Sequence, residues 1–145
     1  MHTGVEIIEH EGNDPKYNMP YAPAIKVHAG KTVYVSGVTA APVYHSHPHV
    51  SSEFDGIPAD DAAAQARAAF DNLQMALRAA GGALSDVVVL FRFIKDLDRN
   101  QDAVNRVQGE FLGGYRPTTT TVEVVRLATD PRLVLELTAI AVVPD

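Results

Sequence analysis

A run of threonines and two acids near the C-terminus has the residue types and spacing of a small polar site. Residues 118–121 are all threonine, and Glu123 follows shortly after them. A second acid, Glu136, stands in the middle of an otherwise apolar segment from Leu133 to Val143. Carboxylates in apolar surroundings can act as general acids or bases, because burial moves their pKa toward neutrality. We therefore expect Glu136 to be an active acid or base; the alternative is a structural ion pair.

The composition of these two segments is typical of β-strands. Both are rich in Thr, Val, Leu or Ile, and side chains alternate between the two faces of a strand. Glu136 then shares its face with Thr138, while the opposite face of that strand is wholly apolar. Thr119, Thr121 and Glu123 share one face of the other strand. We expect the hydroxyls and the carboxylate to meet on neighbouring strands, although the threonines could equally be simple strand formers.

Arg92 is a cation inside a third apolar segment, residues 86–97, which we predict to be a long strand. A buried charge needs a partner, because removing it from water is costly. Two interpretations follow. Arg92 either has a structural role, as an ion pair with Glu136 or Glu123 or as a residue at the rim, or it is a clamp for an anionic substrate.

Three histidines, His45, His47 and His49, stand at alternate positions in a long loop predicted over residues 37–58. Neutral imidazole is the commonest zinc ligand, so this spacing could hold a metal ion. The sequence offers no distant fourth ligand, and this favours a solvated loop tip over a metal site. A third interpretation is that the loop reaches the mouth of a pocket, where a histidine touches the substrate. We expect no metal and no cofactor.

Composition excludes several classes of protein. The 145 residues predict a single domain over residues 1–145. There is no apolar run of about 18 residues, so we expect no membrane segment, and the N-terminus has no secretory pattern. The absence of cysteine excludes disulfides and thiol nucleophiles and is compatible with the cytoplasm, where we expect the protein. A net charge of −6 argues against a nucleic-acid partner.

The fold that these segments predict is α+β, with a single mixed sheet of about six strands and two helices packed on one face. Two helices cover only one face, so the second apolar face must be buried by self-association, sheet against sheet. The remaining predicted elements are an edge strand at Val5–Ile8, a hairpin from Ala24–Val27 to Thr32–Ser36, a helix from a cap at Asp60 or Asp61 to Gly81-Gly82, and a helix from a cap at Asn100 to Gly113-Gly114.

Short motifs along the chain also follow a familiar order. They are Tyr21-Ala22-Pro23-Ala24, residues 33–37, 63–67, 70–72, 79–81, 93–97 and 104–105, and a C-terminal signature over residues 115–124, 126–127 and 135–142. Together they resemble the reactive-intermediate deaminase family (Rid, YjgF-like) over nearly the whole chain from Tyr21 onward. The resemblance implies a chorismate-mutase-like fold and a homotrimer with sites in the clefts between subunits. It also implies hydrolysis of imines or enamines with release of ammonia.

The resemblance implies roles for individual positions in this chain. Glu136 matches the glutamate that helps to place the attacking water, and Thr121 matches a position that lines the pocket with its backbone N–H and small side chain. The other matching positions, for which packing or local hydrogen bonding are the alternative roles, are Ser36, Gly37 and Tyr21, with Tyr17 as a rival for the tyrosine.

Thr119 is a departure from the family pattern. Family members that hydrolyse enamines and imines carry at this position an arginine that binds the substrate carboxylate, and a threonine hydroxyl cannot replace that bidentate contact. The substrate therefore lacks a carboxylate, or Arg92 or Arg116 binds it instead, or the scaffold serves a different, lyase-like or dehydratase-like chemistry. We expect a small-molecule hydrolase acting on C=N bonds; the alternative is a non-catalytic trimer that binds a metabolite.

Overall fold

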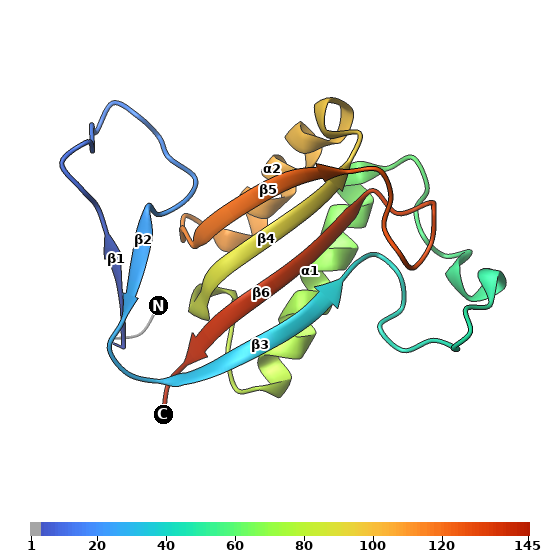
Figure 1. The fold of residues 1–145 in the computed structure, drawn as a ribbon, viewed down its shortest axis with the longest axis horizontal. Helices are drawn as coiled ribbons and strands as arrows, with labels where there is room; N and C mark the ends of the chain where they lie inside the picture. Colours follow the sequence, from blue (N-terminus) through green and yellow to red (C-terminus); the bar gives the residue numbers. More distant parts are fainter. Residues whose placement is uncertain (1–3) are drawn as a thin grey trace.

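The computed structural model describes residues 4–145, and within them the chain forms six strands and two α-helices (Figure 1). No helix in that range is long and apolar enough to cross a membrane. The elements are β1 (Val5–Ile8), β2 (Ala24–Val27), β3 (Lys31–Val38), α1 (Ala62–Ala79), β4 (Val87–Lys95), α2 (Leu97–Leu112), β5 (Thr118–Val124) and β6 (Leu135–Val143), with short 3-10 turns η1 (Ser51–Phe54) and η2 (Leu84–Asp86).

The main sheet has four strands in the order β3-β6-β4-β5. Strand β6 runs antiparallel to both β3 and β4, whereas β5 runs parallel to β4. Both helices lie behind this sheet, on the same face (Figure 1). The α+β class, the six strands and the two helices are therefore confirmed. The strands divide between two sheets, however, because β1 and β2 form an antiparallel pair of their own instead of joining a single mixed sheet.

The predicted hairpin between β2 and β3 is wrong. Strand β2 pairs with β1, and β3 pairs with β6, with Lys31 opposite Val143. The physical reason lies in the side chains. Val33 and Val35 of β3 pack against the main core, whereas β2 is largely exposed and has little apolar surface to contribute. Burial thus draws β3 away from its neighbour in sequence to a partner more than a hundred residues further along the chain.

The core fills the space between the helices and the sheet. The alternation predicted for β6 is confirmed, because its residues Leu135, Leu137, Ala139 and Ala141 all face this core. Each fully buried leucine or phenylalanine there contributes about 2 kcal/mol through the hydrophobic effect. Helix α1 approaches the sheet closely because small alanines alternate with large residues on its buried face. The apolar residues of that face are Ala66, Ala69, Phe70, Leu73 and Leu77, and the buried Gln65 joins them.

Capping interactions and glycines explain where α1 and α2 begin and end. The Asp61 carboxylate accepts a hydrogen bond from the Ala64 backbone N–H at 3.0 Å, so this residue caps α1 as predicted. Helix α2 begins three residues before the predicted cap at Asn100. Its first N–H, that of Leu97, donates to the Glu123 carboxylate of β5 at 2.9 Å. Both helices end at glycines, as predicted, with Gly113 in the left-handed conformation that glycine adopts most readily (φ 57°).

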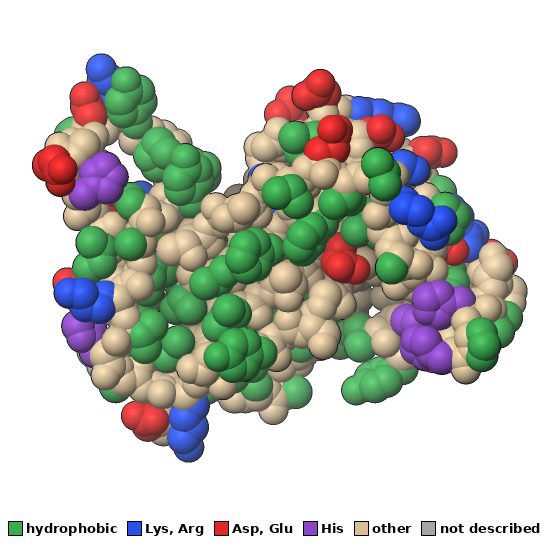
Figure 2. All heavy atoms as spheres, viewed as in Figure 1, with side chains coloured by type: hydrophobic (Ala, Val, Ile, Leu, Met, Phe, Trp, Pro, Cys, Tyr) green, Lys and Arg blue, Asp and Glu red, His purple; other side chains and the backbone are tan. Residues whose placement is uncertain are grey.

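The sheet face opposite the helices carries large apolar side chains that remain exposed in one protomer. Phe91 is 38% exposed, Val122 is 43% exposed and Tyr34 is 77% exposed. Figure 2 shows hydrophobic side chains spread over this face. We call it the open face. An apolar surface of this kind marks an interaction site.

Candidate functional site

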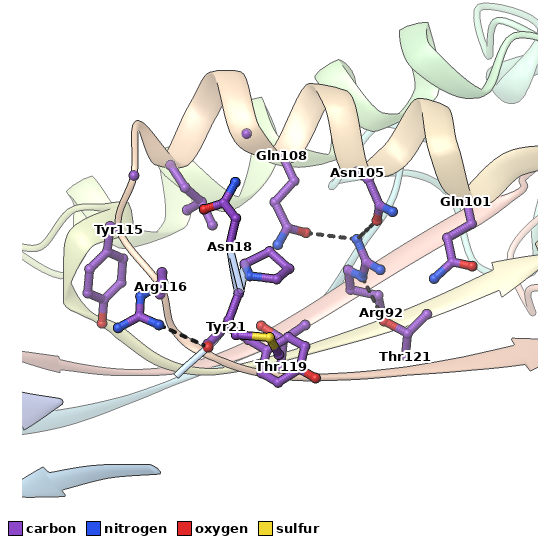
Figure 3. A pocket seen from close by; sticks show the side chains of 15 residues that line it. Asn18, Tyr21, Arg92, Gln101, Asn105, Gln108, Tyr115, Arg116, Thr119 and Thr121 are labelled. Atoms are coloured by element: carbon purple, nitrogen blue, oxygen red, sulfur yellow. Dashed lines mark hydrogen bonds between the residues drawn. The ribbon is translucent and has the colours of Figure 1, made fainter. Parts of the chain in front are cut away.

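A cavity of about 620 Å³ opens between α2, strands β4 and β5, and the segment before β2. Two arginines, Arg92 and Arg116, line it, and no acidic side chain of residues 4–145 does. The cavity is thus cationic in a chain whose formal net charge is −6. Its other polar lining side chains are Asn18, Tyr21, Gln101, Asn105, Gln108, Tyr115, Thr119 and Thr121 (Figure 3).

Arg92 is the buried cation of this cavity, only 6% exposed. Its Nε donates to the Thr121 hydroxyl at 2.8 Å. Its Nη1 donates to the side-chain oxygens of Asn105 at 2.8 Å and Gln108 at 3.1 Å (Figure 3). These neutral groups fix the plane of the guanidinium without neutralising it. Burial lowers the pKa of Arg92 from its usual value, yet an arginine stays protonated at neutral pH.

The guanidinium still has a free donor. Among residues 4–145, Arg92 makes no ion pair, and its Nη2 makes no hydrogen bond. Every fully buried side-chain nitrogen and oxygen of the described residues does have a partner, so Nη2 is not fully buried. It therefore reaches the cavity space. A buried cation held by neutral groups, with one donor left open, has the chemistry needed to pair with an anion.

The second arginine is already occupied. Arg116 pairs with the Glu9 carboxylate and also donates to the Tyr21 carbonyl. Tyr115 is held as well, because its hydroxyl donates to the Val87 carbonyl. Burial raises the pKa of Tyr115 to about 12, so this phenol stays protonated at neutral pH. Arg92 is therefore the cation of the cavity that remains available to a ligand.

The threonines and the tyrosine lie where a ligand of Arg92 would contact them. Thr119 and Thr121 both line the cavity, and Tyr21, 42% exposed, closes one side of it. Tyr17, the rival tyrosine, does not line this cavity and lies instead at a smaller hollow beside Glu9. The structure thus brings together five residues singled out in the sequence, namely Tyr21, Arg92, Arg116, Thr119 and Thr121.

Glu136 lies elsewhere, on the open face. It stands opposite Phe93 in the β4–β6 ladder, beside the bulge of β3 between Val35 and Val38. Its carboxylate approaches Gly37 so closely that a β-carbon there would come within 2.9 Å of it. Glu136 forms no hydrogen bond or ion pair with the described residues, and burial raises its pKa.

One sequence-based expectation is therefore wrong, and one of the alternatives for Arg92 is excluded. Strand β4 separates β5 from β6, so the threonines and Glu136 do not lie on neighbouring strands. Arg92 pairs with neither acid. Glu136 lies on the opposite face of the sheet from it, and Glu123 is occupied at the start of α2. Within one protomer, Ser36, Gly37 and Glu136 lie near the bulge of β3, apart from the cavity that holds Arg92.

Comparison with known proteins places the chain in a family. Residues 11–143 match the family model described as Endoribonuclease L-PSP, the model of the Rid (YjgF-like) proteins. The chain belongs to the Rid family. It is 33% identical over 136 residues to the 3-aminoacrylate deaminase RutC of Acinetobacter baylyi, covering 94% of this chain and 96% of that one. It is also 33% identical over 117 residues to a 2-iminobutanoate/2-iminopropanoate deaminase of Dermatophagoides farinae, covering 81% and 82%.

A solved structure agrees with the Rid fold. The Rid-family protein YyfB of Yersinia pestis superposes with a TM-score of 0.78 at 25% identity, over 97% of this chain and 99% of that one. Thr119, where the family resemblance implies an arginine, lies on the edge strand β5. Arg92 of the adjacent strand β4 lines the same cavity as that threonine. Arg92 and Thr119 therefore lie on adjacent strands of the sheet and line one pocket.

Sequence reasoning missed the residues that hold Arg92. Asn105 and Gln108 of α2 received no role, although their signal is present in the sequence. Gln101, Asn105 and Gln108 are spaced by four and three residues, which places three amides on one face of a helix. A stripe of amides facing a strand that carries an isolated arginine predicts a hydrogen-bonded guanidinium.

Proposed function

We propose that this Rid protein is a deaminase that hydrolyses a small imine or enamine bearing a carboxylate. The observation that carries the proposal is the Arg92 guanidinium, which is buried, fixed by neutral partners and open at Nη2 toward a cavity without acids. The names of its deaminase relatives support the reaction class. An acidic protein with a single available cation in its cavity also suits a small anion better than a polynucleotide.

The carboxylate would bind at Nη2 of Arg92. A guanidinium pairs with a carboxylate through charge-assisted hydrogen bonds, which are stronger than those between neutral groups. The Thr119 side chain, smaller than an arginine, leaves room beside Arg92 for the anion, and Thr119 Oγ1 already donates to the Pro117 carbonyl at 3.2 Å. Arg92 thus supplies from β4 the charge that other family members supply from the position of Thr119.

Glu136 would carry the proton transfers. As a carboxylate it accepts a proton from water while the water oxygen bonds to the imine carbon. Returning that proton to the nitrogen gives a carbinolamine. Glu136 then takes the proton of the new hydroxyl group and passes it to the nitrogen, so that the C–O bond becomes C=O, the C–N bond breaks, and ammonia and a carbonyl compound leave. An enamine first tautomerises to the imine. Burial raises the pKa of Glu136, and an acid with a raised pKa is a better base once it is ionised.

The site would be complete only between two protomers. A small substrate cannot touch Arg92 and Glu136 of the same chain, since the two lie on opposite faces of one sheet. In the homotrimer that the family resemblance implies, the open face of one protomer would pack along the β5 edge of its neighbour, where the cavity opens. This packing would bury Phe91 and Val122 and bring Glu136 of one protomer to the cavity of the next. In such a cleft, one substrate molecule could contact Arg92 of one protomer and Glu136 of the other without a large movement of either chain.

Ammonia release from freshly generated 2-iminopropionate and 2-iminobutyrate tests the proposal. The wild type should be active, whereas Glu136→Gln and Arg92→Gln should lose at least about 100-fold in kcat/KM. Arg67→Gln is the matched control, because Arg67 is an exposed arginine paired with Glu110 and lies outside the cavity.

Three results would overturn the proposal. Full activity in Glu136→Gln would remove the proposed base. An inactive wild type that is nevertheless stabilised by the 2-oxo acid products, in a manner dependent on Arg92, would make the chain a binding protein. An inactive wild type that gains activity as Thr119→Arg would show that Arg92 does not hold the carboxylate.

A further inference from the structure

The three histidines of the long loop gather on one side of it. The ring centroids of His45, His47 and His49 lie 4.8, 5.1 and 5.1 Å apart. One ligand nitrogen from each ring lies within 4.8 Å of the others. Figure 2 shows this histidine patch at the end of the molecule that carries the loop between β3 and α1. The three rings are thus close enough for one bound ion to contact all of them after small side-chain movements.

A packed platform supports the gathered rings. The buried Phe54 ring makes edge contacts with His45 at 5.0 Å and with His49 at 5.4 Å. Phe54 itself belongs to a small second core with Ala41, Ile57, Leu127 and Leu133. The rings thus rest on side chains that are fixed by the fold.

Hydrogen bonds also fix the backbone of this loop. The Glu53 carboxylate accepts from the Ser46 N–H at 2.8 Å and from the Ser46 hydroxyl at 2.6 Å. Arg132 holds the turn η1, since it pairs with Asp55 at 3.0 Å and donates to the Ser51 carbonyl at 3.2 Å. The loop that presents the histidines is therefore largely preorganised.

The tautomer of His45 is set in the way that metal ligands require. Its Nδ1 lies 2.7 Å from the Pro42 carbonyl oxygen, which can only accept a hydrogen bond. Nδ1 must therefore carry the proton and donate it, which leaves the lone pair of Nε2 free. A ligating histidine nearly always donates its other ring nitrogen to a carbonyl or carboxylate in this manner.

We infer that His45, His47 and His49 form a binding site for a divalent transition metal ion that prefers imidazole, with Zn²⁺ as the foremost candidate. Ligand nitrogens about 2.0 Å from Zn²⁺ in a tetrahedral site lie roughly 3.3 Å apart. Closing from 4.8 Å needs only side-chain rotation, because His47 and His49 are exposed. Glu53 is already engaged by Ser46, so the fourth position stays open to water. The sequence alone favours a solvated tip; the convergence of the rings and the set tautomer favour the metal.

Calorimetric titration of the untagged, chelator-treated protein with Zn²⁺ tests the inference. We expect one ion per chain, and a rise in Tm that grows with Zn²⁺ concentration because the ion binds the folded chain. The double variant His47→Ala with His49→Ala should weaken binding by at least roughly 100-fold, since even loss of an outer partner costs 10–100-fold. Co²⁺ provides a spectroscopic readout, because visible absorption bands report tetrahedral coordination.

A matched variant distinguishes this site from general histidine binding. His10→Ala should leave affinity and stoichiometry unchanged, because His10 lies outside the loop and its Nδ1 accepts from the Gly12 N–H at 3.0 Å. Circular dichroism of the double variant establishes that it is folded. The inference is overturned if the wild type binds no stoichiometric Zn²⁺, or if the folded double variant binds as tightly as the wild type.

Discussion

Arg92 and Glu136 occupy neighbouring strands of one sheet yet point to opposite sides of it. Arg92 stands opposite Leu137 in the β4–β6 ladder, whereas Glu136 stands opposite Phe93. Directly opposite residues point to the same face, so the arginine faces the helices with Leu137 and the glutamate faces outward with Phe93. The anion-binding group and the acid of a single chain are thus separated by the sheet itself. The proposed chemistry requires a second copy of the chain.

Replacing Glu136 should alter stability in a pH-dependent way. Burial raises the pKa of this carboxyl, so the folded state is penalised once the group ionises. The penalty is absent below the unfolded pKa, about 4.3, and is complete above the raised folded value. Glu136→Gln should therefore have a higher Tm than the wild type at pH 8 and an equal Tm near pH 4. Thermal scans at both pH values measure this, with the exposed Glu11→Gln as control. A Tm that falls equally at both values would contradict it.

A methyl group at Gly37 should displace the Glu136 carboxylate. The added β-carbon would lie 2.9 Å from Cδ and Oε2 of Glu136, closer than van der Waals contact permits. The far end of a side chain can move more easily than backbone, so Gly37→Ala should fold normally and lose about 10–100-fold in kcat. Gly56→Ala is the control, because no atom lies within 4 Å of its added carbon. Unchanged turnover in Gly37→Ala, measured by ammonia release, would separate this carboxylate from the reaction.

An acidic side chain placed beside Arg92 should compete with an anionic substrate for its guanidinium. Gln108→Glu would place a carboxylate where an amide oxygen now lies 3.1 Å from Nη1. A hydrogen bond to a charged group contributes about 1.5–3 kcal/mol, so Tm should rise while KM for a carboxylate substrate rises at least about tenfold. Gln74→Glu on α1 adds the same charge away from the cavity and should leave KM unchanged. An unaltered KM in Gln108→Glu would mean that the substrate does not use Arg92.

A charge on the open face should dissociate the assembly. Phe91 is 38% exposed on this face, and a buried charge without a partner is strongly unfavourable. Phe91→Glu should therefore be monomeric by light scattering, folded by circular dichroism, and inactive. Met75→Glu, at a residue of α1 that is 54% exposed, should keep the assembly of the wild type. A trimeric Phe91→Glu, or a monomeric wild type, would show that the open face is not the interface.

The sequence predicted local features well and long-range ones poorly. The alternation in residues 133–143 correctly identified the buried face of β6, and Asp61, Gly81 and Gly113 correctly marked helix ends. These signals depend on neighbours in sequence. The pairing of β3 with β6, the position of β4 between the threonines and Glu136, and the capping of α2 by Glu123 depend on contacts between distant segments.

The same difference between local and long-range features applies to the Arg92 cavity and to the histidine cluster. The sequence marked Arg92 as a charge that needs partners but could not decide between an ion pair and an anion clamp. Its partners are amides contributed by α2, which only the packing of that helix on β4 brings near. Likewise, alternate spacing of His45, His47 and His49 does not predict convergence, which requires the Phe54 platform.

The central claim is that Arg92 of one protomer and Glu136 of another serve a single site. Subunit complementation tests it directly. Arg92→Gln and Glu136→Gln, each inactive alone, are mixed under conditions of reversible dissociation and reassembled. Random assortment in a ring of three should restore about one quarter of wild-type ammonia release, because some clefts then receive both native residues. Activity of the mixture no greater than the sum of the separate variants, with hybrid trimers demonstrated by mass spectrometry, would contradict the composite site.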